Sequence, residues 1–549
     1  MLKPSALILS NKQITALEII TILAASLFPI FVRQNYAANV YLAWEGAYRL
    51  YLGQIPYRDF GLPMGYGFWI IPALFFKLFG PYLATLIKAQ AFINILSALA
   101  FRSILRQMLV NPGVRLLSVG LYIISFSFFN IWPWYNHSVI VFEFIGIAFI
   151  LSYITNQNTW IRSISLILGS FFIFLSFFTK QDAGALGFMI VVVLMTYHSI
   201  NTKKILPLIW FVCCFILVAL CFTLPFIPYN ILYWFNYGQP PHSTRISVFD
   251  IIDAFFGESD WIKFYMMIIF LTWVLRLKTH RKIIEDKIFI LFSILITGIL
   301  IEAIILKVTS FTDSNNNIFF HAFAIAYIAS YSGINNHINF KKIVSIGIGG
   351  LFIILWWSPK LWSHTGGIIS RHLEQQEISD TNEVSIHTFI RPDPHKTWTT
   401  SQTGDISKWQ HAPWKVFQGV AIPESTIAGI KRLLDNSLIR TKGKDIKVLN
   451  MTEITPLAQI IGYTPETGPG ISLWYHKNVG VFEKQLKEYE TKIYKHHYDL
   501  ILFEYIPVLN NFYPFEIRDA LKANYLQIDS FPAPRDLFLR EIEIYVRKP

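Results

Sequence analysis

The sequence predicts a mainly α-helical, polytopic membrane protein that ends in a soluble α/β domain. Of its 549 residues, 53% are hydrophobic and only 15% are charged, which is typical of membrane proteins. Apolar runs long enough to cross a bilayer recur as far as Trp357. From about residue 366 onward these runs stop and charged residues become frequent.

A helix needs about 20 apolar residues to cross the hydrocarbon core, and on that criterion we expect about eleven spans. The first, near residues 15–33, is followed by no small-residue cleavage site, so we interpret it as a retained span and not as a signal peptide. The other expected spans lie near residues 85–105, 115–133, 137–154, 162–179, 182–198, 205–228, 262–276, 288–306, 317–335 and 343–358.

The formal net charge of +12 follows the orientation rule of membrane proteins and does not indicate a nucleic-acid partner. If the N-terminus is cytoplasmic, most Lys and Arg residues between the spans lie in short cytoplasmic loops. The longer outside loops then hold few Lys and Arg residues. An odd number of spans then places the C-terminal domain outside. The three cysteines, Cys213, Cys214 and Cys221, lie in one apolar run, which argues against a disulfide framework or a cysteine metal site in the polar regions.

The first outside region, about residues 34–84, is expected to carry two interfacial helices. Residues 64–79 are apolar, but their short length, Pro72 and Lys77 suit a helix at the membrane interface better than a span. Residues 40–52 place aromatic side chains at helical spacing, with Glu45 and Arg49 as an i, i+4 pair.

The C-terminal part, residues 366–549, alternates strand-like and helix-like stretches. Residues 446–451, 500–505 and 541–546 are the strand candidates. We therefore expect a soluble α/β domain behind a membrane domain at residues 1–360.

Acids, histidines and isolated cations gather on the predicted outer side. Glu143 and Glu302 lie within spans, where a carboxyl group is either functional or a hydrogen-bonding partner between helices. The outer turns and loops hold Asn136, His137, Lys180, Asp182, His242 and Arg245. Such a set suits a reaction on a polyprenyl-phosphate-linked sugar, because a carboxylate can take the proton of an acceptor hydroxyl while cations stabilise the phosphate that leaves.

The run GAYRLYLGQIPYRDFGLPMGYGFWIIPALFFKLFG, residues 46–80, resembles the first outer loop of the GT-C membrane glycosyltransferases, in the protein-mannosyltransferase and aminoarabinose-transferase group. There a P-Y-R-D-F pattern precedes a proline-containing interfacial helix that ends in L-F-G. Two weaker similarities follow at WYNHSV, residues 134–139, and TKQDAG, residues 179–184. The sequence resemblance is specific only in this short loop, although the predicted topology fits that of the family over about residues 1–360.

This resemblance implies transfer of a sugar from a polyprenyl-phosphate donor at the outer face, usually with inversion. In the family the catalytic base is an acid at the start of the first outer loop, where this sequence has Asn39. An amide cannot act as a general base. Either Glu45 or Asp59 has taken over the role, supported by Asp182, or the protein is a non-catalytic relative.

The resemblance also implies substrate contacts. Arg58 is expected to contact the donor phosphate, with Lys180 as a second phosphate candidate at a helix N-terminus. The structural alternative is that Arg58 and Asp59 cap the interfacial helix and pin the loop, and that Lys180 snorkels to the interface. The remaining substrate-binding candidates are Tyr57, Asn39, Asn136, His137, His242 and Arg245.

We therefore expect a glycosyltransferase of the bacterial inner membrane. Its expected partners are an undecaprenyl-phosphate-linked sugar donor and membrane lipids, and its acceptor is a lipid, a polysaccharide or a protein. No DxD-type motif appears in the outer loops, so no metal cofactor is expected, with a divalent cation left open. A transporter or flippase of lipid-linked saccharides is the main alternative, but no internal repeat supports it. A polymerase or ligase of surface polysaccharide normally relies on a large outer loop between late spans, which fits this sequence less well.

Overall fold

The computed structural model describes residues 8–36, 40–235, 248–279, 285–310, 318–358, 361, 409–473, 481–506, 514–534 and 541–548. The chain forms two compact units that do not follow its linear order. One, here the helical unit, comprises Met1–Phe28, Ala91–Cys221 and Ser243–Asp380. The other, the mixed unit, comprises Pro29–Gln90, Phe222–His242 and Thr381–Pro549. The first outer loop predicted from the sequence therefore folds with the C-terminal domain, while the boundary predicted near residues 360–366 stays a prediction.

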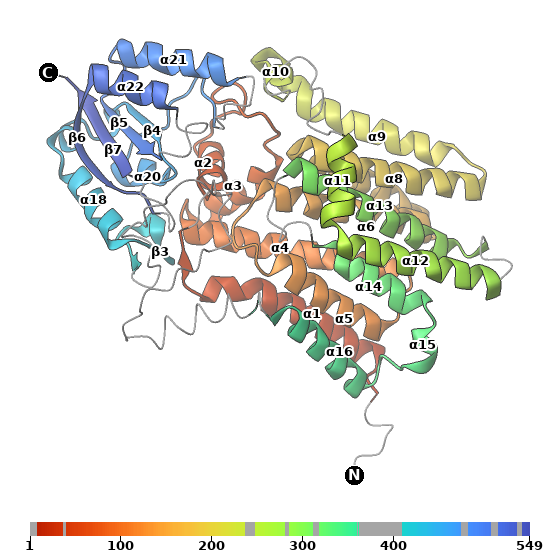
Figure 1. The fold of residues 1–549 in the computed structure, drawn as a ribbon. Coiled ribbons are helices and arrows are strands. Elements are labelled where there is room, and N and C mark those ends of the chain that lie inside the picture. The colour runs from red at the N-terminus through yellow and green to blue at the C-terminus, as the bar shows by residue number, and fades with distance from the viewer. Residues whose placement is uncertain are drawn as a thin grey trace. The chain divides into compact units, whose positions relative to one another are not determined.

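The helical unit is built from long apolar helices (Figure 1). Their bounds are α1 (Asn11–Leu27), α4 (Leu83–Gln107, which begins in the mixed unit), α5 (Pro112–Tyr122), α6 (Tyr135–Thr155), α7 (Thr159–Thr179), α8 (Gln181–Thr202), α9 (Leu206–Thr223, which ends in the mixed unit), α11 (Val248–Glu258), α12 (Asp260–Thr279), α13 (Lys287–Ser310), α14 (Phe320–Tyr331), α15 (Ile334–His337) and α16 (Ile343–Trp356).

The prediction of a mainly helical, polytopic membrane protein is confirmed. Every predicted span falls on a described helix. Within the described residues, 7 helices are long and apolar enough to cross a membrane, and four shorter apolar helices accompany them. The predicted number of crossings stays a prediction.

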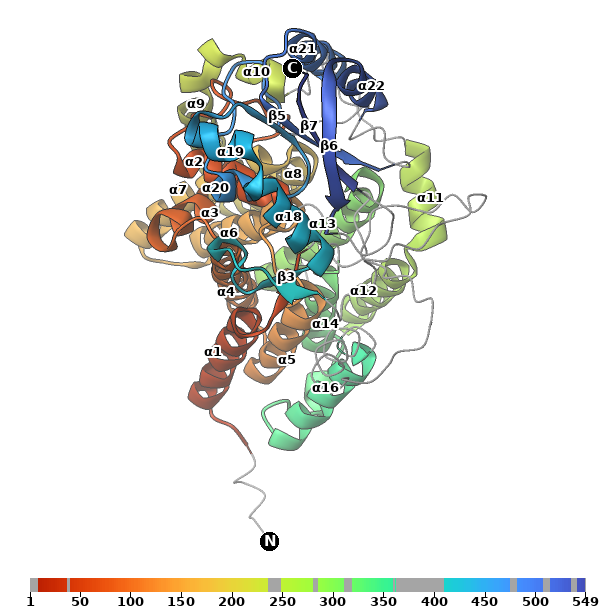
Figure 2. The same ribbon diagram turned by 90° about the vertical axis from the view of Figure 1, so that its left-hand side faces the viewer.

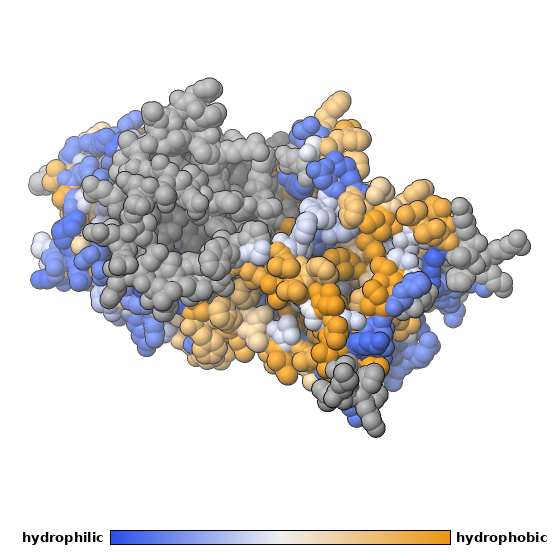
Figure 3. All heavy atoms as spheres, turned by 60° about the horizontal axis from the view of Figure 1, so that its bottom comes forward, coloured by the Kyte–Doolittle hydropathy of each residue, from blue (hydrophilic) through white to orange (hydrophobic). Residues whose placement is uncertain are grey.

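Apolar side chains gather on the face of the helical unit that Figure 3 shows, as contact with lipid requires. Helix α16 has no buried residue, and its side chains Ile348, Leu351 and Phe352 are all exposed. Exposed side chains of α1, such as Ile20 and Leu23, are likewise apolar. Such surface would be unfavourable in water, so the bilayer is the natural solvent of these helices.

Close helix packing inside the unit depends on small residues. A Cβ atom added to Gly146 of α6 would lie 2.7 Å from Ile173 of α7, and one added to Gly169 of α7 would lie 2.7 Å from Ile150 of α6. At each of these two contacts, a glycine of one helix packs against an isoleucine of the other. Small residues at such contacts let membrane helices approach closely.

A fully buried carboxylate joins three helices of this unit. Glu18 of α1 is 0% exposed and accepts hydrogen bonds from Arg102 Nε at 2.6 Å and from Arg115 Nε at 2.7 Å. Both arginines are themselves buried. The pairs hold α1 against α4 and α5, and each charge keeps a partner in a medium that cannot solvate it.

The mixed unit combines short helices with two sheets (Figure 1). Its elements are β1 (Gln34–Asn35), α2 (Val40–Tyr51), α3 (Gly67–Phe79), α10 (Ile231–Phe235), β2 (Gln410–His411), β3 (Val420–Ile422), α18 (Glu424–Asp435), α19 (Ser437–Lys442), β4 (Val448–Met451), α20 (Leu457–Ile461), α21 (Phe482–Tyr494), β5 (Leu500–Tyr505), α22 (Phe515–Asn524), β6 (Tyr525–Pro532) and β7 (Glu541–Arg547).

The larger sheet is the core of the C-terminal domain, which confirms the predicted α/β character. Its strand order is β4-β5-β7-β6, with β4 parallel to β5 and the other neighbours antiparallel. Helices α21 and α22 pack on the face that carries Ile501, Phe503 and Tyr545. Helix α18 packs on Phe531 of β6, which pairs with Ile542 and therefore points to the opposite face (Figure 2). Helices thus cover both faces of the sheet.

The smaller sheet joins the first outer loop to the C-terminal part of the chain. Its order is β1-β3-β2, and Gln34 of β1 pairs with Val420 of β3. The backbone N–H of Tyr36 donates to Ala421 O at 3.0 Å, and the Tyr36 hydroxyl donates to Glu453 O. These bonds bring segments almost four hundred positions apart into one folded body.

Helices α2 and α3 form a tight pair in this unit. The segment interpreted as an interfacial helix is α3, a 13-residue helix with Pro72 inside it. Trp69 of α3 donates from Nε1 to Leu42 O of α2 at 2.9 Å. A Cβ atom on Gly46 of α2 would come within 1.9 Å of the Trp69 ring, so only glycine permits this contact.

We predict that Gly46→Ala separates α2 from α3 and destabilises the protein by about 1–3 kcal/mol, because the Trp69 ring has to move. Thermal unfolding of the protein in detergent checks this. Gly120→Ala in α5 is the matched control, since no atom lies within 4 Å of its added Cβ. An unchanged melting temperature for Gly46→Ala would contradict the packing described here.

We also predict that Glu18→Leu destabilises the protein by about 3–5 kcal/mol, because it leaves Arg102 and Arg115 buried without a counter-charge. The melting temperature in detergent measures the loss. Lys12→Gln, at an exposed position of the same helix, should leave it unchanged. Equal melting temperatures for the two variants would show that the arginines find other partners.

Candidate functional site

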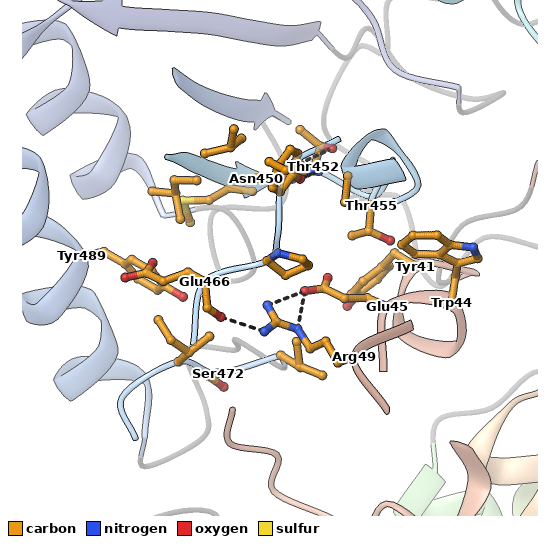
Figure 4. Close-up of a pocket in the computed structure, with 18 residues that line it drawn as sticks. Tyr41, Trp44, Glu45, Arg49, Asn450, Thr452, Thr455, Glu466, Ser472 and Tyr489 are labelled. Atoms are coloured by element: carbon orange, nitrogen blue, oxygen red, sulfur yellow. Dashed lines mark hydrogen bonds and ion pairs between the residues drawn. The ribbon is translucent and has the colours of Figure 1, made fainter. Parts of the chain in front are cut away.

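A cavity of about 120 Å³ lies inside the mixed unit, between α2 and the C-terminal domain (Figure 4). Tyr41, Glu45 and Arg49 project into it from α2. They share one face because they are four residues apart, slightly more than one helical turn. The opposite wall comes from β4, the segment that follows it, residues 463–473, and α21.

Arg49 is the central group of this cavity. It is 4% exposed, and its Nε and Nη2 donate to Glu45 Oε1 at 3.0 and 2.8 Å. Its Nη1 donates to Gln54 Oε1 at 3.0 Å and to the backbone oxygen of Glu466 at 2.7 Å. One guanidinium therefore fixes a carboxylate of α2, the start of the loop after α2, and the C-terminal domain. A planar group with five N–H donors suits this task.

Glu45 is held through only one of its oxygens. Its Oε1 accepts both bonds from Arg49, whereas its Oε2 accepts no hydrogen bond from the described residues. The side chain is 19% exposed and lines the cavity. An ionised carboxylate can accept further hydrogen bonds, so this oxygen is free to accept a proton or a hydrogen bond from a ligand.

The C-terminal wall is made rigid by a network around Asn450. The Asn450 Oδ1 accepts from the backbone N–H of Thr452 at 3.1 Å and from its hydroxyl at 2.7 Å. The Asn450 Nδ2 donates to Ile454 O at 3.3 Å and to the Tyr463 hydroxyl at 3.2 Å. These bonds fix the turn that follows β4 and set the position of Thr455 on the cavity wall.

The far side of the cavity carries a second polar cluster around Glu466. Lys492 donates to Glu466 Oε1 at 2.6 Å, and the Tyr498 hydroxyl donates to Glu466 Oε2 at 2.8 Å. Burial raises the pKa of both Tyr489 and Tyr498 above the ordinary tyrosine value. These hydroxyls stay neutral at physiological pH, which keeps them available as donors.

The charged pair of the P-Y-R-D-F motif lies in the same unit but is satisfied internally. Arg58 Nε donates to Asp59 Oδ1 at 2.8 Å, and Arg58 Nη2 donates to Asp59 Oδ2 at 2.7 Å. The backbone N–H of Ile55 donates to Asp59 Oδ2 at 2.7 Å, and that of Gly468 donates to Asp59 O at 2.8 Å. The Arg58 hydrogen bond holds the pKa of Asp59 below its ordinary value, although partial burial opposes it. The geometry is that of a closed turn pinned to the C-terminal domain.

Tyr57 has an unusual backbone conformation in this turn. Its φ of 65° lies in the left-handed region, which is rare for a bulky residue. The ring is buried at 1% exposure, and the hydroxyl donates to Met64 O at 2.9 Å. The structure thus uses Tyr57 to brace the loop, and its contact with a substrate stays a prediction.

The other candidates lie in the helical unit. Lys180, between α7 and α8, has its Nζ 3.2 Å from the Oδ2 of Asp182 in the first turn of α8. Asn136 and His137 are buried at the start of α6, where the His137 ring lies 4.6 Å from that of Phe126. The convergence of these residues with Glu45 and Asp59 stays a prediction.

Glu143 of α6 and Glu302 of α13 are fully buried in the helical unit and close enough to interact electrostatically. A Cβ on Gly187 of α8 would lie 2.6 Å from the Glu143 carboxyl carbon, so this glycine provides the space for that side chain. Two carboxyl groups side by side exclude a simple ion pair between them.

Three candidates, Asn39, His242 and Arg245, lie outside the described residues. Within the part of the chain that the structure describes, no three His, Cys, Asp or Glu side chains gather as a metal site.

The sequence analysis missed the C-terminal half of the cavity. It identified Glu45 and Arg49 as a helical pair, but it assigned no functional residue after residue 366. Asn450 lies in β4, and Thr455 and Glu466 lie in connections, all without a motif of their own. The weak available signal was the cluster of Asn and Thr at the end of a predicted strand, where polar side chains often shape a site.

We predict that Asp59 stabilises the turn only while it is ionised. Because its folded pKa is depressed, its contribution is present above the unfolded pKa and is lost as the pH falls through the folded value. The difference in melting temperature between the wild type and Asp59→Asn should be constant and small between about pH 5 and 8, and should shrink below about pH 4. A difference that grows as the pH falls would contradict the ion pair.

Comparison with known proteins gives a likeness in fold. No protein-family model and no curated protein matches the sequence. The fold is similar to two crystal structures of ArnT from Cupriavidus metallidurans, one bound to undecaprenyl phosphate and one in the apo state. Each match has 10% sequence identity and a TM-score of 0.48, and it covers 97% of this chain and 98% of the ArnT chain. It is also similar to a cryo-EM structure of the arabinofuranosyltransferase AftD from Mycobacteria, with 11% identity and a TM-score of 0.47 over 99% of this chain and 40% of that chain. ArnT and AftD are GT-C membrane glycosyltransferases, the group that the sequence resembles, and at this identity the likeness concerns the fold alone.

Proposed function

We propose that this protein is an integral membrane glycosyltransferase that transfers a sugar from a polyprenyl-phosphate-linked donor to a lipid, polysaccharide or protein acceptor. The proposal places it in the bacterial inner membrane, with the first outer loop and the C-terminal domain on the periplasmic side. Its support is the P-Y-R-D-F loop in the sequence together with the cavity that α2 and the C-terminal domain build.

The observation that carries the proposal is the state of Glu45. Its carboxylate is anchored by Arg49 through one oxygen, while the other oxygen lines a cavity and accepts no hydrogen bond from the described residues. A positioned carboxylate with one free oxygen is what a general base requires. The Arg49 contacts also limit its motion, so the reacting geometry is set before a substrate arrives.

Glu45 fits the role of base better than Asp59. Both Asp59 oxygens accept hydrogen bonds, three in total from Arg58 and Ile55. The depressed pKa makes Asp59 a weaker base as well. We therefore assign Glu45 as the base that replaces the acid expected at Asn39, with Asp59 holding the loop and Asp182 held by Lys180.

The proposed reaction is a displacement at the anomeric carbon of the donor sugar. Glu45 takes the proton of the acceptor hydroxyl while the oxygen of that hydroxyl bonds to the anomeric carbon. The bond from this carbon to the phosphate oxygen breaks, and its electron pair leaves with the polyprenyl phosphate. Arg58, whose side chain is 45% exposed, is the proposed cation for the leaving phosphate.

Replacement of Glu45 by glutamine tests this function. The glutamine keeps an oxygen for Arg49 but cannot take a proton, so we predict a loss of transfer of about 100-fold or more. The gene is deleted, and lipid-linked and cell-surface glycans are profiled by mass spectrometry before and after complementation with each variant.

Two matched variants sharpen this test. Glu483→Gln, an exposed position of α21, should restore the glycans fully. Asp59→Asn should restore them in large part, because we assign Asp59 to the loop and not to the chemistry. Unchanged glycans after deletion would remove the proposed function, and full rescue by Glu45→Gln would remove Glu45 as the base.

A further inference from the structure

Thr455 is a buried hydroxyl on the cavity wall without a partner. The residue is 5% exposed, and its Oγ1 has no hydrogen-bond partner among the described residues. It lines the same cavity as Glu45, and Figure 4 shows the two side chains facing the cavity from opposite walls. Leaving a buried hydroxyl unpaired costs free energy, so such a group calls for an explanation.

The local structure does not need this hydroxyl. A threonine just before a helix commonly caps it by accepting a backbone N–H bond. Here the N-cap of α20 is Pro456, and no side chain caps the helix. The turn is instead held by the backbone of Thr455, whose carbonyl oxygen accepts from Ala458 N at 3.0 Å, and by Asn450 and Thr452.

The same network holds Thr455 in place with little freedom. Asn450 binds both Thr452 and the Ile454 carbonyl oxygen, which directly precedes Thr455. Strand β4, which carries Asn450, is an edge strand with β5 as its strand partner in the described sheet. The hydrogen bonds of Asn450 therefore position the segment that carries the hydroxyl, as a binding group requires.

We propose that Thr455 Oγ1 binds a hydroxyl group of the sugar that occupies the cavity. This inference rests on the proposed function and adds a sugar-binding role for the C-terminal domain. A polyhydroxylated ligand can exchange hydrogen bonds with Thr455, because a threonine hydroxyl both donates and accepts. Glu45 on the facing wall then accepts from the acceptor hydroxyl, which is the one that reacts.

Thr455→Val separates this role from a structural one. The change keeps the shape of the side chain and removes only the hydroxyl, so the melting temperature should stay equal or rise, because an unpaired polar atom is lost. The initial rate of transfer at low donor should fall about 5- to 20-fold, since the complex loses one hydrogen bond. Thr455→Ser should retain most of the rate.

The assay uses the full-length variants in membranes of the deletion strain, supplied with polyprenyl-phosphate-linked sugars extracted from the parent cells. Thr491→Val is the matched control, because the hydroxyl of this exposed threonine of α21 donates to Lys487 O of its own helix. The expected signature is a stable Thr455→Val protein with a slow reaction, beside a Thr491→Val protein with the wild-type rate.

Two results would overturn the inference. A lower melting temperature for Thr455→Val would show that the hydroxyl is structural, and an unchanged rate would show that no substrate hydroxyl reaches it. Both results are distinct from failure of the proposed function, because then the wild-type protein itself would transfer no sugar from the extract.

Discussion

The guanidinium of Arg49 is the interaction on which the candidate site depends. Its four hydrogen bonds reach Glu45 in α2, Gln54 in the loop that follows, and the backbone of Glu466 in the C-terminal domain. Gln54 continues the link by donating to Pro465 O at 3.2 Å. A buried arginine is stable only when its donors are satisfied, so the three segments have to meet for the charge to be accommodated. The cavity is a consequence of that meeting.

The elements of the fold were predictable because their signals are local. Long apolar runs defined the helices of the membrane-spanning part, and alternating stretches defined strands β4, β5 and β7. The pairing of Glu45 with Arg49 followed from their spacing of four residues on one helix. Another Arg49 partner, the backbone oxygen of Glu466, is 417 positions away, and no spacing rule applies at that distance. Only the tertiary structure could show that the C-terminal domain forms half of the site.

The Arg58 and Asp59 pair shows why residue type alone could not assign roles. Both the functional and the structural interpretation required one cation and one acid at these positions. What separates them is whether the carboxylate oxygens are occupied, and in the folded loop Asp59 accepts from both Arg58 and Ile55 N. The left-handed backbone at Tyr57 is the conformation that folds the motif into this closed turn. The P-Y-R-D-F motif thus has a structural role in the loop, while Glu45, an acid outside the motif, faces the cavity.

Two polar atoms that accept no hydrogen bond from the described residues lie on the cavity wall. Most polar side chains around it, such as Asn450 and Gln54, have their hydrogen bonds made within the protein. Glu45 Oε2 and Thr455 Oγ1 come from different ends of the chain and lie on opposite walls of one cavity. A base and a hydroxyl that face the same space can hold a sugar and activate its acceptor, because the ligand supplies hydrogen bonds to both.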